Sequence, residues 1–325
     1  MNTTAPPSLF RSLVLPLVLS LSAAGCTEPW PTPAPIDAVA FASDHEAWRL
    51  QRQERAVTPP GGPVLWIGLW ELPEGDTRFG SDPSLPVVLP AQDAAPVAGT
   101  LRRRGGSVLL VPETGAGIEI HGEGPVNGPT ELRHDRTPDP TRLALGSLGL
   151  RVHAEPGTDR LWLRAWDEDL PKRATFTLPE YFPVDPEWRV RARFDAYDEP
   201  EILRLPDVTG GTVEFRVPGE LVFRRNGREH RLMATASETS SSFFIMMWDS
   251  TALSKTYQAG RYVRAEFPDS TGWTTIDFNR AYNAPCVFTA HSVCALPPPP
   301  NRLKLAVTAG EMRPAKYPEM PRVGG

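Results

Sequence analysis

The sequence has only three cysteines in 325 residues, and its formal net charge is −5. Three cysteines are too few for a small scaffold held together by disulfides. The negative balance excludes a globally basic protein that coats nucleic acid, so no nucleic-acid partner is expected. The apolar, uncharged stretch of residues 12–25 is shorter than the roughly 20 residues that a permanent membrane-spanning helix needs.

The sequence motifs of common catalytic and cofactor sites are also missing. There is no Gly-x-Ser-x-Gly elbow, no P-loop and no dinucleotide-binding fingerprint. The six histidines do not combine with a carboxylate at a metal-binding spacing, and no zinc motif occurs. We therefore expect no cofactor and no bound metal.

Proline, in contrast, is abundant, with 37 residues. So much proline argues against a mostly helical protein, because each interior proline costs a helix about 3 kcal/mol. The content of 40% hydrophobic and 22% charged residues is typical of globular proteins. The length predicts roughly two domains.

Residues 1–25 are typical of a signal peptide, with Arg11 as the only charged side chain. The small residues Ala23, Ala24 and Gly25 come directly before Cys26, and this pattern resembles a bacterial lipobox. The resemblance implies that the leader is cut before Cys26 and that its thiol carries lipid, which would anchor the protein to a membrane. Thr27, rather than an aspartate, follows Cys26. This resembles lipoproteins that are sorted by default to the outer membrane, where they face the periplasm. Ordinary cleavage and secretion is the alternative.

Three segments are expected to connect the leader with the fold. Residues 26–40 form a tether rich in proline and alanine, which is extended and stiff. Residues 41–62 hold one short helix and a linker. The helix is predicted to start at Ser43, which forms a capping box with Glu46, and to run to about Ala56. Its charged residues, from Glu46 to Arg55, are expected to face solvent.

From Val64 onward, short apolar and alternating runs predict strands. Turns recur about every 8–12 residues, a spacing that indicates a sandwich or barrel. Residues 104–106, residues 156–159 and the pair Asn226–Gly227 are predicted hairpin turns. A charged, proline-containing stretch at residues 167–173 is the predicted boundary between two all-β domains, residues 63–170 and residues 171–325.

The second half carries long motifs that resemble the bacterial family named "domain of unknown function 1684". They are Glu180-Tyr181-Phe182-Pro183-Val184-Asp185-Pro186-Glu187-Trp188-Arg189, Tyr257-Gln258-Ala259-Gly260-Arg261-Tyr262, and Asp277-Phe278-Asn279-Arg280-Ala281-Tyr282-Asn283-Ala284-Pro285-Cys286 with its continuation to Leu303. The resemblance spans about residues 44–312. It implies no established activity.

The first half resembles the start of a forkhead-associated β-sandwich, through Phe79-Gly80-Ser81-Asp82-Pro83 and a later turn at Val126-Asn127-Gly128. Such domains bind phosphothreonine with an arginine directly after the glycine. Ser81 stands there in this sequence, so no guanidinium is available for a phosphate. The resemblance therefore implies the scaffold without the phosphopeptide chemistry.

The densest polar cluster is predicted to hold the functional site: Asp277, Asn279, Arg280, Tyr282 and Asn283. Asp277 and Asn279 share one face of a strand, because side chains alternate. Arg280 offers a planar donor fork for a carboxylate or phosphate. One interpretation is a pocket for a small polar or anionic ligand. The other is a buried network that satisfies the polar groups of an irregular, proline-rich loop.

Seven residues separate Cys286 from Cys294, and nearby cysteines tend to oxidise after export. A disulfide between them would add about 2–3 kcal/mol of stability. Two free buried thiols, or a reactive or metal-binding thiol, are the alternatives.

The sequence thus favours a cell-envelope lipoprotein that binds a small polar ligand or an unidentified protein partner without catalysis. An enzyme, perhaps a hydrolase, with its site in the C-terminal β domain is the second hypothesis. A structural component of the envelope is the third.

Overall fold

The computed structural model describes residues 1–2, 30–31, 35–207 and 211–315. Residues 33–325 form one unit, to which all the elements below belong. The predicted leader and Cys26 lie outside the described residues. In the part of the chain described, no helix combines the length and apolar character needed to cross a bilayer.

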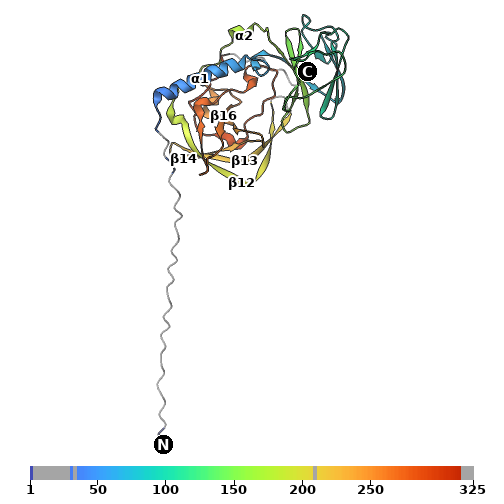
Figure 1. Ribbon diagram of the computed structural model, residues 1–325. Helices are drawn as coiled ribbons and strands as arrows, with labels where there is room; N and C mark the ends of the chain where they lie inside the picture. The colour runs from blue at the N-terminus through green and yellow to red at the C-terminus, as the bar shows by residue number, and fades with distance from the viewer. Residues whose placement is uncertain (3–29, 32–34, 208–210, 316–325) are drawn as a thin grey trace. The chain divides into compact units, whose positions relative to one another are not determined.

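The helix α1, Ala38–Ala56, precedes the strands (Figure 1). The side chain of Asp37 caps it by accepting hydrogen bonds from the backbone nitrogens of Val39 and Ala40. The predicted start at Ser43 is therefore wrong, and the first residues of the helix come from the segment assigned to the tether. The predicted end at Ala56 is confirmed.

The first half of the chain folds into two β-sheets. One has the order β1-β11-β10-β9-β6-β7 and the other the order β3-β2-β4-β5-β8. Their strands are β1 (Trp66–Leu72), β2 (Gly75–Gly80), β3 (Val87–Val88), β4 (Gly99–Arg104), β5 (Ser107–Pro112), β6 (Glu119–Ile120), β7 (Gly124–Pro125), β8 (Thr130–Leu132), β9 (Leu143–Leu145), β10 (Leu148–Ala154) and β11 (Leu161–Asp167).

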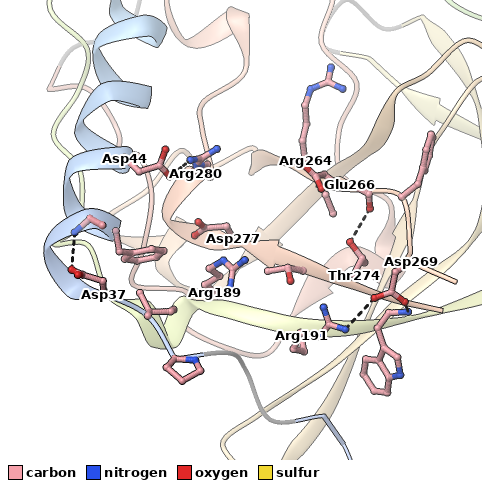
Figure 2. Close-up of a pocket in the computed structure, with 18 residues that line it drawn as sticks. Asp37, Asp44, Arg189, Arg191, Arg264, Glu266, Asp269, Thr274, Asp277 and Arg280 are labelled. Atoms are coloured by element: carbon pink, nitrogen blue, oxygen red, sulfur yellow. Dashed lines mark hydrogen bonds and ion pairs between the residues drawn. The ribbon is translucent and has the colours of Figure 1, made fainter. Parts of the chain in front are cut away.

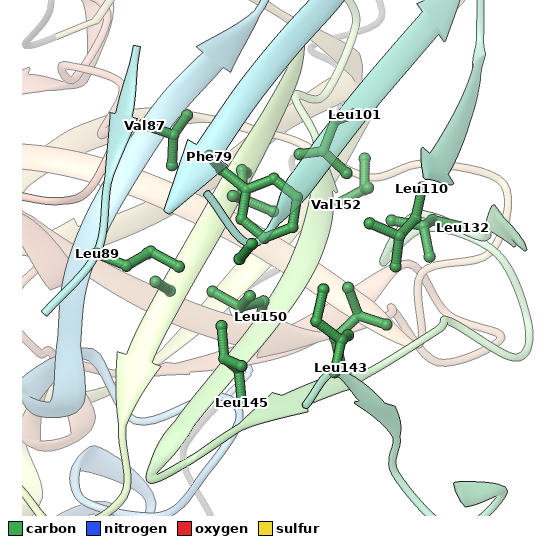
Figure 3. Close-up of a cluster of buried hydrophobic side chains, with 14 of the residues drawn as sticks. Phe79, Val87, Leu89, Leu101, Leu110, Leu132, Leu143, Leu145, Leu150 and Val152 are labelled. Carbon is green, nitrogen blue, oxygen red and sulfur yellow. The ribbon is translucent and has the colours of Figure 1, made fainter. Parts of the chain in front are cut away.

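Both sheets contribute to one apolar core, as a sandwich requires (Figure 3). Phe79 and Leu101 come from one sheet, and Leu143, Leu150 and Val152 come from the other. Their inward positions follow the alternation of side chains along each strand. The other face of the β1-β11-β10 sheet carries bulky and charged groups, including Arg164.

The second half builds a seven-stranded sheet in the order β14-β13-β12-β17-β16-β15-β18. Its strands are β12 (Arg189–Pro206), β13 (Thr212–Arg225), β14 (Arg228–Ala234), β15 (Ser242–Asp249), β16 (Arg261–Glu266), β17 (Trp273–Asp277) and β18 (Arg302–Leu303). A bridge between Thr235, after β14, and Phe244 of β15 makes the sheet curl back on itself. The buried Asn301 strengthens this closure by donating to the carbonyls of Met233 and Met246.

Short helical segments connect these strands: α2 (Lys172–Thr175), η1 (Pro63–Leu65), η2 (Pro186–Trp188), η3 (Ser250–Leu253), η4 (Phe278–Arg280), η5 (Pro285–Val287) and η6 (Pro299–Asn301). The all-β fold class is confirmed. All three predicted hairpin turns lie between paired strands, and Asn226 and Gly227 both have positive φ, of 51° and 70°.

Candidate functional site

His45 docks the helix α1 onto the C-terminal sheet. Its side chain is buried, with Nδ1 2.7 Å from the carbonyl oxygen of Phe41 and Nε2 2.8 Å from Oδ2 of Asp277. Both partners are acceptors when Asp277 is ionised, so the protonated ring, with an N–H on each nitrogen, satisfies both contacts. Burial alone would lower the pKa of His45, but the hydrogen bonds to Asp277 and Phe41 outweigh it and raise the pKa.

This geometry argues against a catalytic role for His45. A general base needs an unprotonated ring nitrogen within reach of substrate. Here both nitrogens already donate to groups of the protein, and the ring has no solvent exposure. The His45–Asp277 pair is therefore a structural contact between α1 and the end of β17.

The second oxygen of Asp277 holds a buried asparagine. Oδ1 accepts from the backbone nitrogen and from Nδ2 of Asn279, each at 3.0 Å. The Asn279 side chain also exchanges hydrogen bonds with both backbone groups of Asp185, each at 2.9 Å. Asp277 and Asn279 thus satisfy the polar groups of irregular segments, as the network interpretation of the sequence predicts.

Arg280 pairs with Asp44 of the helix α1. The side chains of Arg280 and Asp44 are 36% and 63% exposed. The pair is therefore well solvated and is worth little to the stability of the fold.

A second polar contact centres on Glu311, which is fully buried. Its Oε2 lies 3.1 Å from Nη2 of Arg52, and the backbone nitrogen of Asn283 donates to it at 2.7 Å. The hydroxyl of Tyr181 donates to Oε1 at 2.7 Å. Burial and the neighbouring carboxylate raise the pKa of Tyr181, so it remains a donor.

The helix charges predicted to face solvent are thus only partly solvated. Arg52 reaches Glu311, and Arg49 stacks on the ring of Tyr181 with 4.3 Å between the guanidinium carbon and the ring centroid. The sequence did not show this, because the partners lie more than 130 residues away along the chain.

Two hollows flank α1. The larger, of about 740 Å³, lies at the N-terminal end of the helix and includes Asp277 and Arg280 in its wall (Figure 2). Its wall carries four arginines and five carboxylates, and two ion pairs form among them: Arg280 faces Asp44, and Nη2 of Arg191 lies 3.5 Å from Oδ2 of Asp269. These pairs leave little net field to attract a ligand of one sign.

The smaller hollow, of about 300 Å³, lies along the C-terminal half of α1, and we name it the Trp48 pocket. Its wall carries three aromatic rings and three arginines: Trp48, Tyr282, Phe288, Arg52, Arg55 and Arg264. No carboxylate belongs to this wall among the described residues. The volume is at the lower end of the range of small-molecule sites.

Two groups of the Trp48 pocket have unused hydrogen-bonding capacity. Arg55 is exposed in the last turn of α1 and has no ion-pair or hydrogen-bond partner among the residues described. Asn283 is buried, and its Oδ1 has no hydrogen-bond partner in the described structure. The pocket therefore offers a free cation beside aromatic surface.

The predicted cluster separates into two places. Asp277, Asn279 and Arg280 bind helix and loops together, whereas Tyr282 and Asn283 belong to the Trp48 pocket. The residues that the helix contributes to that pocket were not predicted from the sequence. The spacing of Trp48, Arg52 and Arg55 could have indicated them, because it places all three on one face of a helix.

Cys286 and Cys294 are free, buried thiols in this structure, so the predicted disulfide is not formed in it. No group of three or more metal-binding side chains occurs within residues 35–207 and 211–315.

Residues 174–312 match the model of a family described as "Protein of unknown function (DUF1684)". The match starts well after the residue 44 expected from the motifs. A solution NMR structure of an uncharacterised protein of Haloarcula marismortui is 35% identical, over 44% of this chain and 80% of that one, with a TM-score of 0.37. No curated protein matches the chain. The matched residues 174–312 are thus similar to the DUF1684 family, which the motifs of the second half indicate.

Proposed function

We propose that this protein binds a small anionic ligand in the Trp48 pocket without catalysing a reaction on it. One observation carries the proposal: Arg52, Arg55 and Arg264 line one small pocket whose described wall contains no carboxylate. Guanidinium groups bind carboxylates and phosphates through paired, charge-assisted hydrogen bonds.

The rest of the wall narrows the ligand further. Arg52 is already bound to Glu311, so Arg55 and Arg264 are the arginines best placed to bind the anion. The rings of Trp48, Tyr282 and Phe288 favour a flat apolar body next to the charge.

The cellular setting is part of the same proposal. The leader and the lipobox-like residues before Cys26 support a lipid-anchored protein of the bacterial envelope, in the outer membrane where the cell has two membranes. The N-terminal sandwich would serve as a forkhead-associated-like scaffold. Intact-mass spectrometry of the native protein tests the anchor: diacylglycerol on an N-terminal Cys26 is expected, and an unprocessed Met1 would contradict it.

Calorimetric titration of the purified chain with benzoate, acetate and inorganic phosphate tests the pocket. Binding of benzoate is expected to be the tightest of the three, because it combines an anion with a ring. Arg55→Ala is expected to weaken it about tenfold or more, since a hydrogen bond to a charged group contributes about 1.5–3 kcal/mol.

Arg102→Ala is the matched control, because Arg102 is an exposed arginine on β4 that pairs with Asp76 outside the pocket. It should leave the titration unchanged. The proposal fails if none of the three anions binds, or if Arg55→Ala and Arg102→Ala have the same effect.

A further inference from the structure

Cys286 and Cys294 bring two thiols together inside the C-terminal part of the chain. Their side chains are buried, at 2% and 4% exposure. The backbone nitrogen of Cys286 donates to Sγ of Cys294 at 3.2 Å. This contact places the sulfur of Cys294 against the backbone of Cys286, so the two cysteines are direct neighbours in the fold.

The surroundings of the two sulfurs differ. Sγ of Cys294 accepts from the backbone nitrogen of Cys286 and lies 3.4 Å from Oγ of Ser292, whereas the Tyr262 hydroxyl donates to the carbonyl of Ala295. The bond from Cys286 lowers the pKa of Cys294, and the other donors add to it against the effect of burial. Donating to Cys294, together with burial, raises the pKa of Cys286. Of the two thiols, Cys294 is the one that the backbone N–H of Cys286 favours as an anion.

Arg164 of β11 supplies a buried positive charge to the same place. Its side chain is buried, it lies 3.7 Å from the ring centroid of Trp66, and its Nε and Nη1 have no hydrogen-bond partner. The acidic groups that interact with it electrostatically are Asp135 and Cys294, and Asp135 is already hydrogen-bonded to His153. A cation without a full partner stabilises a nearby thiolate.

A small cavity of about 10 Å³ borders both sulfurs and the rings of Tyr257 and Tyr262. It has room for about one water-sized molecule. A bulky disulfide oxidant cannot enter a space of this size, so among common oxidants the small hydrogen peroxide molecule is the better candidate. The size of the cavity therefore limits which oxidants can reach the two thiols.

The geometry points to Cys286 and Cys294 as a peroxide-reactive dithiol, in which Cys294 attacks the peroxide and Cys286 resolves the product. The Cys294 thiolate takes one oxygen of hydrogen peroxide, the O–O bond breaks, and hydroxide leaves to become water, which gives a sulfenic acid. Cys286 then loses its proton and attacks that sulfur, the S–O bond breaks, and a second water leaves. Two thiols and one peroxide thus yield one disulfide and two waters.

Treating the folded full chain with hydrogen peroxide, followed by alkylation and peptide mass mapping, tests this inference. The expected product is a disulfide between Cys286 and Cys294, formed before the protein unfolds. Cys286→Ser should stop at a sulfenic acid on Cys294 that dimedone labels. Cys294→Ser is the matched control, and its Cys286 should stay unlabelled. Peptide mapping keeps Cys26 separate from the pair.

Arg164→Met is expected to slow the reaction about tenfold, the change in thiolate fraction for a one-unit rise in the pKa of Cys294. Thiols that stay reduced until the protein is unfolded would overturn the inference, and so would dimedone labelling of Cys286 in Cys294→Ser. Faster oxidation by a bulky disulfide than by peroxide would overturn the assigned oxidant. All of these outcomes are independent of ligand binding in the Trp48 pocket.

Discussion

Nε2 of His45 and Oδ2 of Asp277 lie 2.8 Å apart, and this contact joins the helix α1 to a strand 232 residues further along the chain. The Phe41 carbonyl accepts the other ring proton, so both hydrogen bonds of the His45 side chain form only when the ring is protonated. The attachment of the helix to the C-terminal sheet is therefore linked to a protonation equilibrium.

The stability of the protein should fall as the pH rises through the folded-state pKa of His45. Folding raises this pKa, so the contribution is complete below the unfolded value of about 6.5 and is lost above the raised folded value. His45→Gln should be less stable than the wild type at low pH, and the difference should shrink as the pH rises. Urea unfolding across this pH range measures it. A difference independent of pH would contradict the linkage.

Much of the fold could be predicted from the sequence, because the patterns that indicate strands and turns are local. The turn at Asn226–Gly227 needs positive φ at both positions, and those two residue types supply it. The first residue of α1 could not be predicted in the same way. Asp37 and Ser43 are both good N-caps, and the sequence pattern favoured Ser43 through its capping box with Glu46. The structure selects Asp37.

Only half of the candidate site could be predicted from the sequence, because its residues are brought together by contacts between distant parts of the chain. Tyr282 and Asn283 stood out in a polar motif, but Arg52 looked like one charge of a solvated helix. Its partner Glu311 lies 259 residues away in a segment after the last strand, where no periodicity marks it. Local patterns contain no information about such a pair.

Glu311→Ala should destabilise the protein by about 3–5 kcal/mol, because it leaves the Arg52 guanidinium without its buried carboxylate. It also removes the acceptor for Tyr181 and Asn283. Denaturant unfolding measures the loss. Asp76→Ala is the matched control, since its ion pair with Arg102 is exposed on both sides and its loss should have a far smaller effect. Equal effects of the two variants would refute the central role of Glu311.

Arg280→Ala should change the free energy of unfolding by less than about 1 kcal/mol, because its pair with Asp44 is solvated. It should also leave benzoate binding unchanged, since Arg280 lines the larger hollow and is absent from the wall of the Trp48 pocket. Unfolding experiments and calorimetric titration on one preparation test both statements. A loss of several kcal/mol would show that Arg280 belongs to the buried network, and a loss of binding would move the ligand site to the larger hollow.

Arg164→Met should leave the stability of the protein unchanged or raise it by about 1 kcal/mol. Burial, together with the nearby Arg151, lowers the pKa of Arg164 to about 10, which means that folding disfavours its charge. Two of its nitrogens have no hydrogen-bond partner, so few favourable contacts are lost with the guanidinium. Methionine keeps apolar contact with Trp66 and removes the cost of burying a charge. Denaturant unfolding of both proteins near neutral pH measures the difference. A loss of 3 kcal/mol or more, on the order expected for breaking a buried ion pair, would show that Arg164 has a full anionic partner in the folded protein.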